Sequence, residues 1–184
     1  MTAEIELKAH ITDSEALKLL LKRKAEYLSE FVKQDTYWFF HENRRGLRIR
    51  KEKLKFPDGS EKALSFATYK EKTVQDGIEI NNEREFEVQP AEEFEEFLSR
   101  LGFKVSYTKQ KRGWAFTYEG INAELLEVEG LGWFIELEIL AGVNDASAIA
   151  EGKKRLLGFL DSLGIKREAV ESRFYSELLG VSNT

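Results

Sequence analysis

The stretch Glu4-Ile5-Glu6-Leu7-Lys8 is the first example of the pattern that decides this fold. Read as a β-strand, it places Glu4, Glu6 and Lys8 on one face and Ile5 and Leu7 on the other. Two carboxylates about 7 Å apart along a strand can share a divalent cation, and the lysine can hold an anion that the cation bridges. Solvated strands also carry this pattern, so it gains weight only because it recurs later in the chain.

The composition describes one charged globular domain, which we expect to span residues 1–184. Hydrophobic residues make up 42% of the chain and charged residues 33%, with a net charge of -5. The chain has neither 18 consecutive apolar residues nor a signal-peptide pattern, so we expect no membrane partner. The negative charge argues against a general nucleic-acid binder.

The rare residue types narrow the chemistry further. Zero cysteines exclude disulfides, thiolate metal sites and cysteine nucleophiles, and they fit a cytoplasmic location. With only two histidines in the chain, a metal site would need hard oxygen ligands. These ligands favour Mg²⁺ or Mn²⁺ over zinc as the cofactor.

Alternation and turn signals predict a chain made mostly of strands. The turn Pro57-Asp58-Gly59 indicates a hairpin over residues 47–72. Short connections favour antiparallel pairing in an α+β domain, and about eight strands are enough to close a small barrel. The predicted strands cover residues 3–11, 27–40, 47–51, 64–72, 83–88, 103–109, 110–119, 121–129 and 133–140. The predicted helices cover residues 13–28, 90–101, 145–163 and 168–178.

The polar faces of these strands carry charges in blocks of one sign. For a single strand of this kind, a solvated sheet face is the simpler interpretation. For six such strands together, it is not. Glutamates on one face repel one another unless cations lie beside them. If the sheet closes, these faces line one interior, where charges persist only when they are paired or bind ions. Four of these strands show the pattern most clearly. Their charged residues are Arg48 with Arg50, Lys70 on the face of Phe66 and Thr68, Glu83 with Glu85 and Glu87, and Glu136 with Glu138.

An interior of this kind suits a polyphosphate. Arginine and lysine bind phosphate oxygens, arginine often through two nitrogens at once. Paired glutamates hold the Mg²⁺ or Mn²⁺ that accompanies the phosphates. The sequence has no glycine-rich phosphate loop, so side chains would grip the phosphates.

The order and spacing of these segments resemble the CYTH superfamily, also called the triphosphate tunnel metalloenzymes. The resemblance runs from Glu4 to about Leu179. It is carried by the opening E-x-E-x-K, by Leu47-Arg48-Ile49-Arg50, by Thr68-Tyr69-Lys70, by Glu83-x-Glu85-x-Glu87, and by the stretch from Glu129 to Glu138. Gln34-Asp35-Thr36-Tyr37 and the stretch from Arg173 to Leu179 are similar to the branch with class IV (CyaB-type) adenylate cyclases.

The resemblance implies a closed eight-stranded antiparallel β-barrel with flanking helices, in which a triphosphate and a divalent metal bind. It also implies a role for individual residues. The metal ligands or their close neighbours would be Glu4, Glu6, Glu136 and Glu138. The catalytic and phosphate-binding bases would be Lys8, Arg48, Arg50, Lys70 and Arg112, with Lys111 as a further candidate. Glu85 and Glu87 would orient these bases or a second metal.

Two positions depart from the family pattern. The family often has a lysine two residues before the late arginine, where this chain has Gln110. Lys109 or Lys111 could compensate, but regular alternation turns both away from the face of Arg112 unless a bulge intervenes. The family also often has an aspartate near the position of Leu126, and here Glu124 lies two residues earlier on the same face.

Two reactions and one binding role fit this interior. A cyclase would convert ATP to cyclic AMP and pyrophosphate, and similarity to the CyaB branch favours it. A triphosphatase would hydrolyse inorganic triphosphate, thiamine triphosphate or a nucleoside triphosphate. A non-catalytic polyphosphate-binding module needs bases alone, so eight inward glutamates count against it. Homodimers are common in the family, and the sequence leaves the oligomeric state open.

Overall fold

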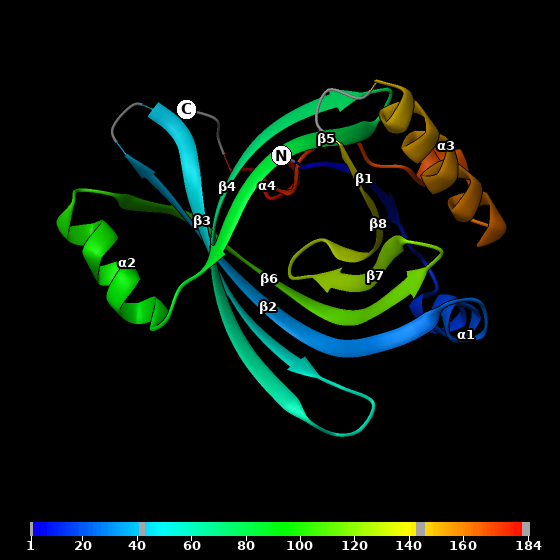
Figure 1. Cartoon of the computed structure of the whole chain (residues 1–184), viewed down its shortest axis with the longest axis horizontal. Coiled ribbons are helices and arrows are strands. Elements are labelled where there is room, and N and C mark those ends of the chain that lie inside the picture. The colour runs from blue at the N-terminus through cyan, green and yellow to red at the C-terminus, as the bar shows by residue number, and fades with distance from the viewer. Residues whose placement is uncertain (1, 41–42, 143–145, 182–184) are drawn as a thin grey trace.

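Eight antiparallel strands close into a barrel in the order β1-β5-β4-β3-β2-β6-β7-β8. Figure 1 shows where each labelled strand and helix lies. The computed structural model describes residues 2–40, 43–142 and 146–181. Each strand pairs with two neighbours, which confirms the α+β fold with a closed barrel. The strands are β1 (Thr2–His10), β2 (Glu26–Phe40), β3 (Asn43–Lys55), β4 (Glu61–Gln75), β5 (Ile78–Glu87), β6 (Lys104–Tyr118), β7 (Ile121–Val128) and β8 (Gly132–Gly142).

Three helices, α1 (Ser14–Lys24), α2 (Ala91–Arg100) and α3 (Ala146–Ser162), lie on the outside of the barrel. In Figure 1, α1 and α3 lie on one side, and α2 lies on the opposite side. A carboxylate oxygen of Asp13 caps α1 by accepting the backbone N–H of Ala16 at 2.9 Å. No helix in the described ranges is long and apolar enough to cross a membrane.

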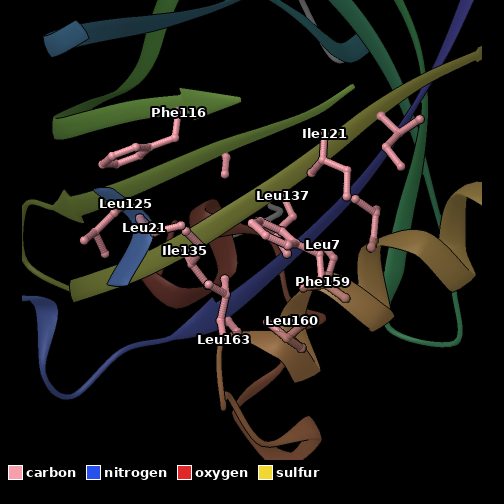
Figure 2. Packing of buried hydrophobic residues seen from close by; sticks show 14 of the residues in the cluster. Leu7, Leu21, Phe116, Ile121, Leu125, Ile135, Leu137, Phe159, Leu160 and Leu163 are labelled. Atoms are coloured by element: carbon pink, nitrogen blue, oxygen red, sulfur yellow. The ribbon is translucent and has the colours of Figure 1, made fainter. Parts of the chain in front are cut away.

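The main apolar core lies between the outer face of the barrel and helices α1 and α3. Ile5 and Leu7 on β1 are almost fully buried there. Figure 2 shows Leu7 and Leu137 near Phe159 and Leu160, which come from α3. Burial of each such side chain contributes about 1.5–3 kcal/mol. Because successive residues of a strand face opposite ways, this packing turns the charged residues of β1 and β8 into the barrel.

Two smaller apolar clusters complete the packing. One lies beneath α2 and contains Ile49, Ala67 and Leu98. The other closes one part of the barrel interior, where Tyr175 of the short helix α4 (Tyr175–Leu178) packs edge-on against Phe134 with ring centroids 5.2 Å apart. We call this second cluster the plug, and its buried members are Phe31, Leu126, Val128, Phe134 and Tyr175.

Several predicted boundaries are wrong. The helix predicted over 13–28 ends at Lys24, because the next residues pair with β6 as the start of β2. The strands predicted over 103–109 and 110–119 form the single strand β6, which pairs with β2 along nearly its whole length.

Further differences lie in β3, β4, β5 and the C-terminal segment. Both β3 and β4 extend at each end beyond the predicted strands 47–51 and 64–72. β5 begins at Ile78, five residues before the predicted start. The helix predicted over 168–178 is a 3₁₀ turn (Arg167–Ala169) followed by α4. The predicted start of the 145–163 helix falls outside the described residues.

Gly113 on β6 provides a test of how tightly the barrel is closed. A Cβ added at Gly113 would lie 2.1 Å from the carbonyl oxygen of Leu125 on β7. We therefore expect Gly113→Ala to lower the free energy of unfolding by more than about 3 kcal/mol, measured by chemical denaturation. The control is Gly158→Ala on the exposed side of α3, where a Cβ meets no atom within 4 Å. It should raise stability by about 0.5–1 kcal/mol, and equal effects at both sites would contradict this account.

Candidate active site

The barrel interior contains a cavity of about 1360 Å³ to which all eight strands contribute. Tyr175 and Ser176 of α4 also line it. The charged side chains are separated by strand: the neighbouring strands β4, β3, β2 and β6 carry the basic ones, and β7, β8, β1 and β5 carry the acidic ones, with Glu52 on β3 as the exception. The basic lining residues are Lys33, Arg48, Arg50, Lys70, Lys72, Lys109 and Lys111, and the acidic ones are Glu4, Glu6, Glu52, Glu79, Glu83, Glu85, Glu124, Glu136 and Glu138.

Lys70 on β4 stands among three carboxylates from two strands. Its ammonium group contacts Glu4, lies 3.4 Å from Glu6, and lies 3.1 Å from Glu83. These carboxylates raise the pKa of Lys70 despite its burial, and Lys70 lowers the pKa of Glu6. Burial nevertheless raises the pKa of Glu4 to about 7, helped by the neighbouring Glu83. The group therefore holds more carboxylate than one lysine can neutralise.

The inner face of β8 adds two further carboxylates. Lys111 donates to both carboxylate oxygens of Glu136, at 2.7 and 2.8 Å, and this contact lowers the pKa of Glu136 although the group is buried. Glu138 lies directly opposite Glu6 in the β1–β8 register. Burial and the charge of Glu6 raise the pKa of Glu138 to about 7.

Two arginines of β3 form the basic part of the wall. Arg50 donates to both carboxylate oxygens of Asp35, at 2.7 and 3.0 Å, and this ion pair holds the pKa of buried Asp35 well below its usual range. Arg48 donates to Thr68 at 2.9 Å and to Glu83 and Glu85 at 3.3 and 3.2 Å. The bidentate pair fixes one arginine, whereas the other has only long contacts to carboxylates.

A third group combines Lys109 with two tyrosines. Lys109 donates to the hydroxyl of Tyr37 at 3.0 Å and lies 3.4 Å from Asp35. Although burial favours the neutral phenol, the Lys109 charge lowers the pKa of Tyr37 to about 8. Tyr37 stacks on Tyr107 with ring centroids 4.2 Å apart, so both rings are held in place beside the cavity.

Lys8 lies inside the barrel as predicted from its strand face, but it is only 2% exposed. Its ammonium group lies 2.5 Å from Glu79, which also pairs with Lys72 at 3.1 Å. A phosphate could contact Lys8 only after Glu79 had moved away. Glu79 was not among the predicted site residues, although the alternation of β5 places it on the same face as Glu83.

Arg112 does not line the cavity, which corrects its predicted position. Its side chain is 67% exposed on the outside of the barrel and donates to Glu127 at 2.7 Å. β6 alternates regularly here, so Lys109 and Lys111 face inward while Gln110 and Arg112 face outward. The two lysines occupy the inward positions that the family comparison had given to Gln110 and Arg112.

Glu87 is the second residue whose predicted position is corrected. It lies beyond the cavity at the end of β5, is exposed, and accepts a hydrogen bond from the Gln89 side chain at 2.7 Å. Glu124 faces the cavity and accepts from Lys33 at 2.5 Å, whereas Leu126 belongs to the plug. The other predicted residues, namely Glu4, Glu6, Arg48, Arg50, Lys70, Glu85, Lys111, Glu136 and Glu138, all line the cavity.

The inward carboxylates suit a divalent cation by their chemistry. Hard oxygen donors from β1 and β8 face one another, and two of these groups have a pKa near 7 because negative charge is crowded there. Within the described ranges, three or more such side chains are nowhere gathered in a ready-made ligand set. Lys70 and Lys111 hold Glu4, Glu6 and Glu136 instead, so a cation would have to take these carboxylates from the lysines.

Comparisons with known proteins agree with this geometry. The family model for the CYTH domain matches residues 2–175. A protein of Methanocaldococcus jannaschii named "Putative adenylate cyclase" is 27% identical over 97% of this chain and 99% of its own length.

Solved structures of other proteins share this fold. A protein of Pyrococcus horikoshii is 30% identical, with a TM-score of 0.79 over 96% of this chain and 97% of that one. A Hippeastrum protein shares the fold at 17% identity, with a TM-score of 0.65 over 99% of this chain and 97% of that one. That protein is described as a "putative adenylyl cyclase" that has a dominant triphosphatase activity.

The raised pKa of Glu138 predicts a stability that depends on pH. The value is about 7 in the folded protein against a usual 4.5, so the neutral form is favoured on folding. Its contribution to stability is therefore complete below pH 4.5 and is lost as the pH rises through 7. We expect Glu138→Gln to raise the free energy of unfolding by about 1–3 kcal/mol at pH 8 and to leave it nearly unchanged at pH 4.5. Urea denaturation at both pH values measures this, and an equal effect at each would contradict it.

Proposed function

Because this chain belongs to the CYTH family, we propose that it is a divalent-metal-dependent enzyme whose triphosphate substrate binds inside the barrel. The proposal rests above all on the cavity wall, where bases and carboxylates from all eight strands face one space. A polyphosphate needs the bases, and the cation that accompanies it needs the carboxylates. Phosphoryl transfer depends mainly on positioning and charge neutralisation, which such a wall provides.

In this proposal the bases of β3, β4 and β6 hold the phosphate oxygens. Arg50 is fixed by Asp35, and Arg48 is oriented by Thr68 and Glu85, so both guanidinium groups are positioned before substrate arrives. Lys70, Lys109 and Lys111 supply the remaining positive charge. The residues proposed to hold Mg²⁺ or Mn²⁺ are Glu4, Glu6, Glu136 and Glu138. When bound, the cation would neutralise the phosphate charge and favour departure of the leaving group.

We propose adenylate cyclisation as the reaction. The similarity over nearly the whole chain to a protein named "Putative adenylate cyclase" supports this choice. The cavity also has an aromatic part, with Tyr107 stacked on Tyr37 and with Trp38 and Phe39 nearby, against which a purine base could pack. The 3′-hydroxyl of ATP would attack the α-phosphorus, forming the new ester bond as pyrophosphate leaves with the bridging oxygen.

Triphosphate hydrolysis is the second candidate. In this reaction water attacks the terminal phosphorus of inorganic triphosphate, thiamine triphosphate or a nucleoside triphosphate. The same wall would serve, because the two reactions differ only in which phosphorus lies in line with the nucleophile. The Hippeastrum protein, which shares this fold, is described with a dominant triphosphatase activity. Which phosphorus is attacked is therefore what the first experiment must establish.

Product analysis separates the candidates. The protein is incubated with Mg²⁺ or Mn²⁺ and, separately, with ATP, inorganic triphosphate and thiamine triphosphate. Cyclic AMP with an equal amount of pyrophosphate is the expected result, whereas orthophosphate release would establish the hydrolase instead. Glu136→Ala should lower turnover at least about 100-fold, because it removes a proposed metal ligand, while the circular dichroism spectrum stays unchanged. Metal-dependent triphosphate binding without any turnover would overturn both enzyme proposals in favour of a binding module.

Lys111 and Arg112 form a matched pair because they are adjacent on β6 and face opposite sides of the barrel wall. We expect Lys111→Met to raise KM or lower kcat by at least about tenfold, because it removes a charge beside the phosphates. Arg112→Met should leave both constants within about twofold of the wild type. Steady-state kinetics on the substrate found above tests this pair, and the reverse order of effects would show that β6 is turned the other way.

A further inference from the structure

β5 carries two adjacent asparagines that lie on opposite sides of the barrel wall. Asn81 shares the inner face with Glu79 and Glu83, both of which line the cavity. In the register of the sheet it lies opposite Glu4 on β1 and opposite Lys72 on β4. Asn81 therefore lies on the inner face of β5 between two cavity-lining glutamates, although it is not itself among the residues that line the cavity, whereas Asn82 faces outward.

The side chain of Asn81 is fully buried, yet neither of its polar atoms has a partner. Its exposed fraction is 0%, and neither Nδ2 nor Oδ1 makes a hydrogen bond to any described residue. Buried amide groups are normally satisfied, because burial without a hydrogen bond is costly. No described residue uses either the donor or the acceptor of this amide, although Asn81 is fully enclosed and is not itself among the residues that line the cavity.

The charged neighbours of Asn81 are engaged with one another. Glu79 accepts from Lys8 at 2.5 Å and from Lys72 at 3.1 Å. Lys70 contacts Glu4 and lies 3.1 Å from Glu83. These ion pairs involve charged residues of β1 and β4, the two strands that flank β5. The Asn81 amide lies beside these pairs but makes no hydrogen bond to them.

A purely structural role does not explain an asparagine at this position. Leucine has a similar volume and would fill the same space without burying two unpaired polar atoms. A lysine here would compete for Glu4, and a further glutamate would add to the crowded negative charge. A neutral amide avoids both effects and offers an oxygen and an N–H group at the same point.

We propose that Asn81 is a binding residue for the metal–triphosphate complex, in which Oδ1 would serve the cation and Nδ2 would donate to a phosphate oxygen once the neighbouring ion pairs have opened. This assignment rests on the proposed function, because it needs a triphosphate and a cation in the barrel. Amide oxygens are hard donors that suit Mg²⁺ and Mn²⁺ or the water bound to them. The amide would thereby contact both parts of the ligand, the cation beside the glutamates and the phosphates beside the basic residues.

The test replaces the amide by an apolar side chain of similar size. Asn81→Leu and the control Asn82→Leu are compared with the wild type by calorimetric titration of inorganic tripolyphosphate in the presence of Mn²⁺. We expect Asn81→Leu to weaken binding at least tenfold and Asn82→Leu to change it less than twofold. The control is closely matched, because Asn82 also has a buried unpaired oxygen but lies on the outer face.

Thermal unfolding without ligand provides the second measurement. If Asn81 is kept for binding, Asn81→Leu should unfold at the same temperature as the wild type or a higher one, because it removes two unsatisfied buried atoms. Unchanged tripolyphosphate affinity in a folded Asn81→Leu protein would overturn the assignment. Equal loss of affinity in both leucine variants would overturn it as well, since the effect would then not depend on the inner face.

A second variant covers the case in which Asn81→Leu does not fold. Asn81→Asp keeps the oxygen and removes the N–H donor, so tripolyphosphate should bind at least tenfold more weakly while Mn²⁺ alone binds no more weakly than to the wild type. Tripolyphosphate affinity equal to that of the wild type would overturn the assignment. If the wild type itself binds no tripolyphosphate with Mn²⁺, the proposed function fails, and that result is distinct from a failure of Asn81 alone.

Discussion

The pairing of opposite charges inside a closed barrel is the constraint on which this structure depends. Charged groups taken out of water persist only when counter-charges neutralise them. Lys70 is surrounded by glutamates from β1 and β5, and Arg50 forms a bidentate pair with buried Asp35. These ion pairs join strands that are distant in the chain, so the interior is held together by charge where most domains have an apolar core.

This interior determines where the hydrophobic core must lie. Because side chains alternate along a strand, inward charges leave the apolar residues of β1, β7 and β8 on the outer face. Helices α1 and α3 cover that face, and leucines and phenylalanines fill the space between them. Within the barrel, the plug around Tyr175 is the apolar exception. The ring of Tyr175 also lies 4.8–5.5 Å from the ammonium groups of Lys8, Lys109 and Lys111.

The same ion pairs shape the proposed chemistry. A triphosphate with its cation would bind by exchange of partners, since the bases now hold the carboxylates that the cation needs. Lys111 must release Glu136 for a phosphate, and Lys70 must release Glu4 and Glu6. Such exchange would give each released carboxylate a cation and each released lysine a phosphate, so binding of the cation and binding of the triphosphate would depend on each other.

The sequence by itself determined the fold and most of the candidate site, because the two faces of a strand follow from local alternation. Glu4 and Glu6, Arg48 and Arg50, and Glu136 and Glu138 were identified in this way, and the order of these segments indicated the CYTH family. Only the tertiary structure showed that Lys109 and Lys111, rather than Arg112, face inward, that Glu79 holds Lys8, and that Asn81 lacks a partner. Alternation groups residues by face without saying which face is enclosed. That choice, and each side chain's partner, depends on register between strands that are far apart in the sequence.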